Sequence, residues 1–113
     1  MERVIELARR LGRVIASHER FREYKEAQKA VESDPETRRL LDEYEAQERK
    51  IAELEAALKP VEPEDKRALE ALREKAAQNP LLKRLLKARV DYAELMHKVN
   101  EAIKAELNAP PQK

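Results

Sequence analysis

Two histidines and many carboxylates are the residues in this sequence whose types could do chemistry. His97 follows Glu94 by three residues and precedes Glu101 by four, a spacing at which side chains on a helix are neighbours. Metal centres in helical bundles need more ligands than this, such as two Glu-x-x-His motifs with two further glutamates. The sequence contains one such motif, and His18 lies far from it. We therefore expect no metal site and no other cofactor.

The other residue types do not make a recognisable catalytic set. The chain has no cysteine, and its single glycine cannot build a glycine-rich phosphate loop. No serine, histidine and acidic residue suggest a triad, and nothing distinguishes any pair among the 23 acidic residues. We expect no catalytic residues, and therefore a protein that is not an enzyme.

A cluster of basic residues is the feature that could bind nucleic acid. Lys83, Arg84, Lys87 and Arg89 fall between residues 79 and 90, where there is no acidic residue. Such a face can contact phosphates. The other interpretation is a solvated face that pairs with acids of a neighbouring helix. The formal net charge of +1 implies no chain-wide attraction to nucleic acid, so phosphate binding is the alternative function.

The composition predicts an all-α fold. Charged residues make up 42% of the chain and aromatic residues 4%, with one glycine, which is typical of long helices and coiled coils. No apolar run approaches the 18 or so residues that a membrane span needs, so we expect no membrane insertion. The first ten residues do not resemble a secretory signal, so a cytoplasmic location is expected.

Start and stop signals divide the chain into five expected helices. Ser17, Asp34 and Asn79 are good N-cap residues, and Pro35 and Pro80 follow the last two at the first helical position. The expected helices are residues 2–16, 18–32, 35–58, 64–77 and 80–107. We expect residues 1–107 to form a single helical-bundle domain and residues 108–113 to be a disordered tail.

The length of the last helix predicts self-association. At 1.5 Å per residue, the segment 80–107 is roughly 40 Å long, whereas a compact chain of this size has a radius of gyration of about 13 Å. We expect it to pair antiparallel with the segment 35–58, with the shorter helices packed against this pair, and the apolar edges of both to be shared in a homodimer. The candidates for dimer or partner contacts are Phe21, Tyr24, Tyr44, Ile51, Leu54, Tyr92, Met96 and Val99.

Four positions allow two interpretations each. Phe21 and Tyr24 are either core residues or anchors for a partner. Gln47 interrupts an apolar seam, so it is either a buried polar residue that fixes register or a wet one on a slightly rotated helix. Gly12 within the first helix reflects either the close approach of another backbone or simple tolerance.

Three stretches of the sequence resemble the YlbF/YmcA family of small bacterial helical proteins, with the YheA-like branch nearest. They are FREYKEAQKAV up to Val31, SDPETRRLLDEYEAQERKI from Ser33, and QNPLLKRLLKARVDYAELMHKVNEAI from Gln78. The phrases EYKEA and QNP are specific in combination and order. The resemblance extends from about Val4 to Leu107.

The resemblance implies an all-α fold of roughly five helices, often a homodimer. Some members regulate competence, sporulation and biofilm formation, within a complex that assists messenger-RNA maturation by a membrane-anchored endoribonuclease. Iron–sulfur clusters in that complex are bound by cysteines, which this chain lacks. The prediction is a non-enzymatic adaptor, and the alternatives are a nucleic-acid binder and a helical dimer whose partner the sequence does not identify.

Overall fold

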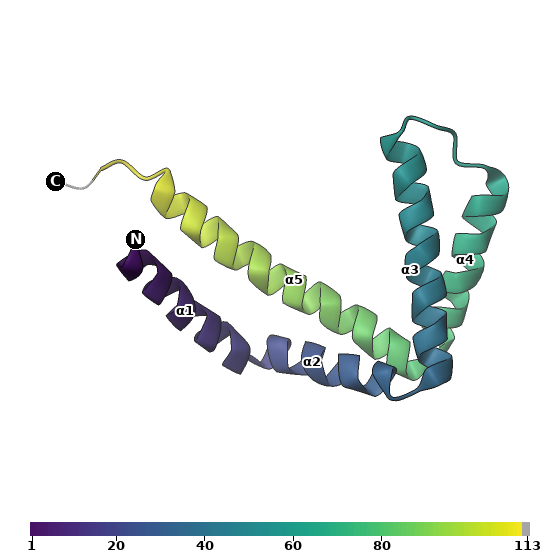
Figure 1. Cartoon of the computed structure of the whole chain (residues 1–113), viewed down its shortest axis with the longest axis horizontal. Helices are drawn as coiled ribbons and strands as arrows, with labels where there is room; N and C mark the ends of the chain where they lie inside the picture. Colours follow the sequence, from purple (N-terminus) through teal and green to yellow (C-terminus); the bar gives the residue numbers. More distant parts are fainter. Residues whose placement is uncertain (112–113) are drawn as a thin grey trace. The chain divides into compact units, whose positions relative to one another are not determined.

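The computed structural model describes residues 1–111, and within them the fold is all-α with five helices and no strand, as predicted (Figure 1). The helices are α1 (Glu2–Ser17), α2 (Glu19–Glu32), α3 (Pro35–Ala56), α4 (Pro63–Gln78) and α5 (Pro80–Leu107). The bounds of α5 are those expected, and those of the other four helices differ from the expected ones by at most two residues at either end. None of the described helices is both long enough and apolar enough to cross a membrane.

Contacts divide the chain into two compact units. The hairpin unit is Ala27–Leu86, and the terminal unit combines Met1–Glu26 with the chain from Lys87 onwards. The helices α2 and α5 each contribute to both units. The prediction of a single domain stays a prediction. Of the predicted disordered tail, residues 108–111 are described as a turn, a bend and non-helical chain, and residues 112 and 113 lie outside the described part.

Prolines set the start of three helices. Pro35, Pro63 and Pro80 each occupy the first helical position, where a missing N–H costs no hydrogen bond. The predicted capping by Ser17, in contrast, is wrong. Ser17 ends α1 and its hydroxyl donates to the carbonyl of Val14 at 2.9 Å, because a serine in a last turn can bond back to the preceding turn.

The helices α3 and α4 form an antiparallel hairpin, and Figure 1 shows them side by side. We expected α3 to pair with α5, whereas the contacts within the hairpin unit pair α3 with α4. The reason is the short connection, which spans residues 57–62 and returns the chain beside the helix it has just left.

The hairpin connection begins with a Schellman motif at the end of α3. The Lys59 N–H donates to the Leu54 carbonyl at 2.9 Å, and the Leu58 N–H donates to the Glu55 carbonyl at 3.1 Å. This geometry places Leu58 in the left-handed region, with φ at 56°. The motif thus closes the helix with a leucine at a position that favours glycine.

Almost all fully buried residues of the described chain belong to the hairpin unit. They are Ala27, Val31, Thr37, Leu41, Ala76, Leu82 and Leu85, whereas Ala88 is the single buried residue of the terminal unit. No residue of α1 is buried. For Gly12, no described atom outside its own helix turn would lie within 4 Å of an added Cβ, so close approach of another backbone in the same chain does not explain it.

Candidate protein-interaction surface

Three of the predicted contact residues pack against one another within the terminal unit. Phe21 and Tyr24 lie one turn apart on α2, and both contact Tyr92 of α5. The rings of Phe21 and Tyr92 meet edge to face at 5.6 Å, and those of Tyr24 and Tyr92 stack at 5.3 Å. All three rings are half-buried. Because Phe21 and Tyr24 pack against Tyr92 of the same chain, the structure supports the interpretation of both as core residues.

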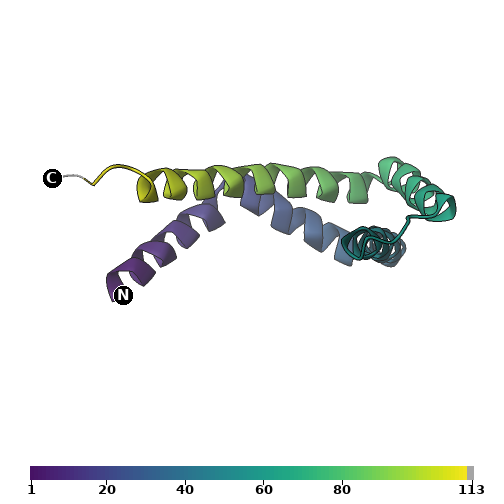
Figure 2. The same cartoon turned by 90° about the horizontal axis from the view of Figure 1, so that it is seen from above.

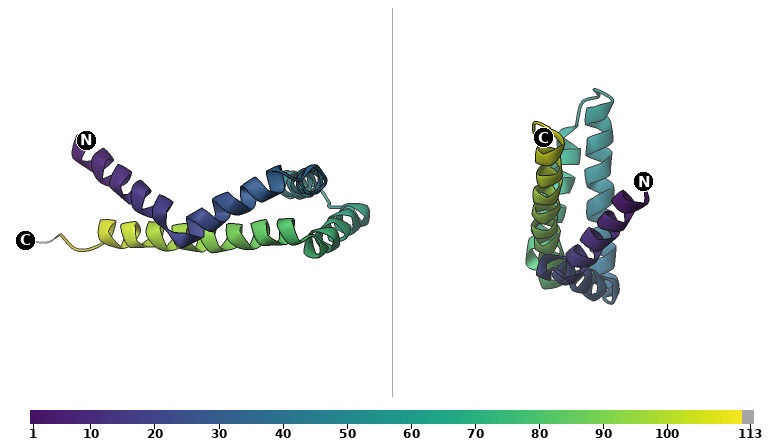
Figure 3. Two further views of the ribbon diagram at one scale, coloured as in Figure 1. Left: turned by 90° about the horizontal axis from the view of Figure 1, so that it is seen from below. Right: turned by 90° about the vertical axis from the view of Figure 1, so that its left-hand side faces the viewer.

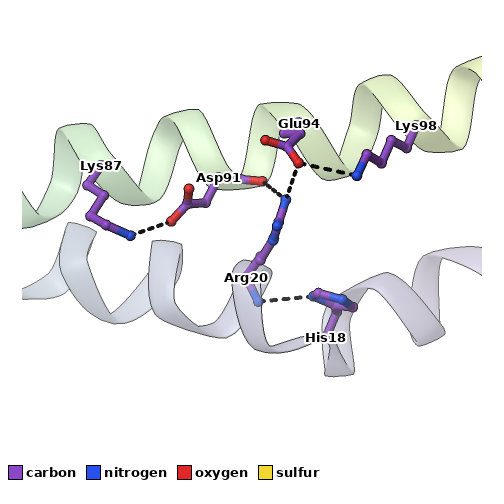
Figure 4. Close-up of polar contacts among 6 residues, drawn as sticks. All are labelled: His18, Arg20, Lys87, Asp91, Glu94 and Lys98. Carbon is purple, nitrogen blue, oxygen red and sulfur yellow. Dashed lines mark hydrogen bonds and ion pairs between the residues drawn. The ribbon is translucent and has the colours of Figure 1, made fainter.

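Polar contacts centred on Arg20 join the start of α2 to α5 next to these rings (Figure 4). Its Nη1 atom donates to the Asp91 carbonyl at 3.0 Å and lies 3.4 Å from Glu94 Oε1. Glu94 also lies 3.3 Å from Lys98 Nζ. Hydrogen bonding from Lys98, followed by the charge of Arg20, lowers the pKa of Glu94. Glu94, the carboxylate of the single Glu-x-x-His motif, thus lies in an ion-pair network.

The start of α2 is capped by a residue that the sequence analysis did not assign to capping. His18 Nδ1 accepts the backbone N–H of Arg20 at 3.0 Å, as Figure 4 also shows. His18 therefore occupies the role that was predicted for Ser17. Among residues 1–111, no group of three or more His, Asp or Glu side chains is arranged to hold a metal ion.

A second polar cluster lies in the hairpin unit, where α3 and α5 begin. The Thr37 hydroxyl donates to Asp34 Oδ2, and Asn79 Nδ2 donates to Thr37 Oγ1 at 2.8 Å. Asn79 Oδ1 accepts the N–H of Leu82 at 3.1 Å, as expected of an N-cap. Thr37 is fully buried. The starts of α3 and α5 are thus hydrogen-bonded to each other.

Sequence reasoning predicted both capping positions but missed Thr37. Asp34 stands at the N-cap of α3, yet its side chain binds the Thr37 hydroxyl instead of capping a backbone N–H. The available signal was the Asp-x-x-Thr spacing, in which the third helical residue carries a hydroxyl that faces the cap. That spacing alone does not reveal Asn79, which lies 42 residues further along the chain.

Gln47 makes a hydrogen bond across the helical hairpin. Its Nε2 donates to the Asp65 carbonyl at 2.9 Å, and the side chain is half-buried. One turn further along α3, Lys50 Nζ lies 2.8 Å from the Asp65 carboxylate. These contacts support the interpretation in which Gln47 fixes the register of α3 against α4.

The remaining contact candidates are half-buried as well. Tyr44 lines a small apolar hollow of about 220 Å³ in the hairpin unit, together with Arg73 and Leu86. Ile51 and Leu54 lie further along α3, and Met96 and Val99 lie on α5 beyond Tyr92. None of the eight predicted contact residues is among the exposed large apolar residues, and their role in dimer contacts stays a prediction.

The exposed apolar residues gather instead on α1, which the sequence analysis did not name as a contact surface. Along this helix the exposed fractions are 67% for Val4, 50% for Leu7, 37% for Leu11 and 65% for Val14. We call these four residues the α1 seam. Their steps of three, four and three residues, which are already visible in the sequence, were the signal that could have identified the surface.

The four basic candidates are divided between the two units. Lys83 and Arg84 belong to the hairpin unit, and Lys87 and Arg89 belong to the terminal unit. Lys83 lines the same hollow as Tyr44. Lys87 Nζ lies 2.9 Å from the carboxylate of Asp91, one turn along α5. This ion pair fits the interpretation of a charged helix face, and nucleic-acid contact stays a prediction.

A family model described as "Control of competence regulator ComK, YlbF/YmcA" matches residues 4–108. Among solved structures, the chain is similar to a "Protein of Unknown Function (DUF964) from Bacillus stearothermophilus", with a TM-score of 0.83 and 21% sequence identity. That match covers 92% of this chain and 91% of the other, and at this identity it shows the fold alone. No curated protein matches.

Proposed function

This chain belongs to the YlbF/YmcA family, and from that premise we propose that it is a non-enzymatic regulatory adaptor that acts through protein–protein contacts as a homodimer. The family description connects it with control of a competence regulator. Roles in RNA processing, sporulation or biofilm regulation belong to the same proposal.

One observation carries the proposal, namely the unequal distribution of buried residues. The hairpin unit contains every fully buried residue of the described chain except Ala88. The terminal unit has an amphipathic helix with no buried residue and further exposed apolar side chains at Ile103 and Leu107. A helix with an apolar stripe is stabilised when that stripe is removed from water. We therefore infer that a protein partner covers the apolar residues of this unit.

Sedimentation equilibrium of the full chain at tens of micromolar tests the homodimer. The expected result is a mass of twice the 13.2 kDa chain. A stable monomer over the whole concentration range would contradict the homodimer.

A titration with single-stranded RNA and duplex DNA tests the adaptor against the alternative predicted from Lys83, Arg84, Lys87 and Arg89. Phosphate contacts weaken steeply with rising salt, whereas apolar docking does not. We expect no binding even at low salt. Salt-sensitive binding that is lost when Lys83 and Arg84 are replaced by Gln would favour the nucleic-acid function.

Genetic complementation tests the regulatory role. A competent bacterium that lacks its own YlbF/YmcA homologue should regain expression of competence genes when it is supplied with this chain. The matched control is the same chain with Leu82 replaced by Asp, which disrupts the buried core. Equal rescue by this variant, or no rescue by a well-expressed wild-type chain, would argue against the role.

A further inference from the structure

The α1 seam has the spacing of a coiled-coil contact. Val4, Leu7, Leu11 and Val14 recur at the steps of three and four residues that place side chains along one line of a helix. A helix of this length is marginal in water without packing, and helical stability in proteins comes mostly from an amphipathic face that is covered. No residue of the 16-residue α1 is buried and Ile15 is its only half-buried residue, so most of this helix is open to a cover from another molecule.

A second seam of the same kind lies in the terminal unit, on α5. Tyr92, Met96, Val99 and Ile103 follow one another at steps of four, three and four residues. The first three are half-buried, whereas Ile103 is 47% exposed and Leu107, one turn later, is 77% exposed. Figures 2 and 3 show that α1 diverges from this part of α5, and that the N-terminal end of α1 lies farthest from it. Both seams are therefore open at the same end of the unit.

Charge indicates which helix fits the α1 seam. The helix α1 carries four arginines and two glutamates, so it is basic. Residues 94–107 of α5 carry three glutamates and two lysines, and Glu94 and Glu101 pair with these lysines, so this part is weakly acidic with a net charge of −1. A contact between two α1 helices would place basic on basic, whereas α1 against the end of α5 places basic on acidic, which favours association.

An anionic lipid surface fits α1 less well. Glu6 lies 3.8 Å from Arg9, 3.9 Å from Arg10 and 3.3 Å from Arg13, so a carboxylate lies among three of the four arginines. The helix has neither Trp nor Phe, the aromatic residues that enrich interfacial helices.

We propose that the α1 seam of one copy docks on the C-terminal half of α5 of a second copy, and that the reciprocal contact closes a four-helix bundle of two α1 and two α5 helices. This inference rests on the proposed homodimer and adds its contact surface. A closed two-fold dimer uses the same patch on both subunits, which this exchange of seams provides. Such a bundle would bury both seams in its core.

Disulfide mapping tests the contact, because the chain has no cysteine of its own. Chains that carry Ile103→Cys are mixed with chains that carry a single Cys in place of Val4, Leu7, Leu11 or Val14, and the mixture is oxidised gently. Each chain has one thiol, so every disulfide between α1 and α5 joins two copies. Arg9→Cys, on the polar side of α1, is the matched control.

The expected result is cross-linking of Ile103→Cys with seam positions, stronger than each seam variant with itself and absent for Arg9→Cys. Dominant self-cross-linking of the seam variants would replace the inference with an α1–α1 contact. If the chain sediments as a dimer but gives no α1–α5 cross-link, the inference fails and the homodimer stands. A chain that sediments only as a monomer removes the homodimer itself.

A charge placed in the seam gives a second measurement. We expect Leu7→Asp to weaken dimerisation at least about tenfold, because a carboxylate would be buried without a partner. Leu58→Asp makes the same change at an exposed leucine of the hairpin unit and should leave the dimer unchanged. Equal dimerisation of Leu7→Asp and the wild-type chain overturns the inference. So does wild-type binding to vesicles of phosphatidylglycerol that Leu7→Asp abolishes.

Discussion

The hairpin unit and the helix α1 show two fates of the same apolar spacing. In the hairpin unit, Leu82 and Leu85 are buried and the starts of α3 and α5 are joined through Thr37 and Asn79. In α1, an equally regular row of aliphatic residues leaves all four of its members exposed. Periodicity therefore predicts which face of a helix is apolar. It does not predict whether that face is covered by the same chain, which only the burial of its residues shows.

Truncation of one leucine in each region tests this comparison most directly. Leu82→Ala removes a fully buried side chain and should lower the free energy of unfolding by about 2–5 kcal/mol. Leu7→Ala, measured by denaturant unfolding at concentrations too low for dimers, should cost about 1 kcal/mol or less.

The same pair of variants distinguishes a covered α1 from an open one. If Leu7→Ala costs the dilute chain as much as Leu82→Ala does, α1 is already packed within a single copy. At concentrations at which dimers form, the cost of Leu7→Ala should rise, since the seam is then buried.

The polar cluster of the hairpin unit gives the next largest effect. Thr37→Val keeps the shape of the side chain but removes the hydroxyl that donates to Asp34 and accepts from Asn79. Leaving these groups without their partner should cost about 1–3 kcal/mol. Thr37→Ser keeps the hydroxyl and is the control.

A double-mutant cycle with Asn79→Ala sharpens this prediction. The two substitutions should be non-additive by about 0.5–3 kcal/mol, as expected for residues in one hydrogen-bond network. Strict additivity would mean that Asn79 stabilises the chain only as the cap of α5.

Much of the fold could be predicted from the sequence because its signals are local. Proline at the first helical position and a polar residue before it depend on neighbouring residues alone, and they gave the starts of α3 and α5 correctly. The all-α class followed from composition for the same reason. The cap of α2 was assigned to the wrong residue because Ser17 and His18 can both bind backbone groups, and the choice depends on where α1 ends.

What the sequence could not provide was the pairing of segments that are distant along the chain. The hydrogen bond between Asn79 and Thr37 joins helices with a third one between them, and the pairing of α3 with α4 required the chain reversal at Leu58. The aromatic residues were reasonable candidates for a surface, but Phe21 and Tyr24 found a partner in Tyr92. The aliphatic residues of α1 were not chosen as contact candidates, because aliphatic residues mark a contact surface less clearly than aromatic ones. They are nevertheless the exposed ones.

The turn that closes the hairpin can be made more favourable. Leu58 is 94% exposed and adopts a φ of 56°, which costs an L-residue roughly 1–2 kcal/mol. Leu58→Gly should therefore raise the free energy of unfolding by about 1 kcal/mol, measured by thermal and denaturant unfolding. Ala57→Gly is the matched control, because Ala57 has a φ of −85° and glycine should destabilise there. A loss of stability in both variants would mean that the Leu58 side chain makes a contact of its own.

The ion pair between Lys50 and Asp65 gives the smallest effect and the one that depends on pH. Hydrogen bonding from Lys50 lowers the pKa of Asp65 below its ordinary 3.8, and the same bond raises the pKa of Lys50 above 10.5. A lowered carboxyl pKa contributes stability above the ordinary value and loses it as the pH falls through the folded value. A raised lysine pKa contributes stability below 10.5 and loses it as the pH rises through the folded value. The pair therefore stabilises the hairpin between these two limits.

Lys50→Met should make acid unfolding begin at a higher pH, because Asp65 then loses the main cause of its lowered pKa. The shift should be modest and should shrink at high salt, since the Lys50 side chain is 60% exposed. Helix content followed against pH at two salt concentrations measures it. Asp42→Asn removes an exposed pair with Arg38 within a single helix and should leave the acid transition in place. An acid transition that is the same for Lys50→Met and the wild-type chain would show that Gln47 alone holds Asp65 against α3, and the register of the hairpin would then depend on that one hydrogen bond.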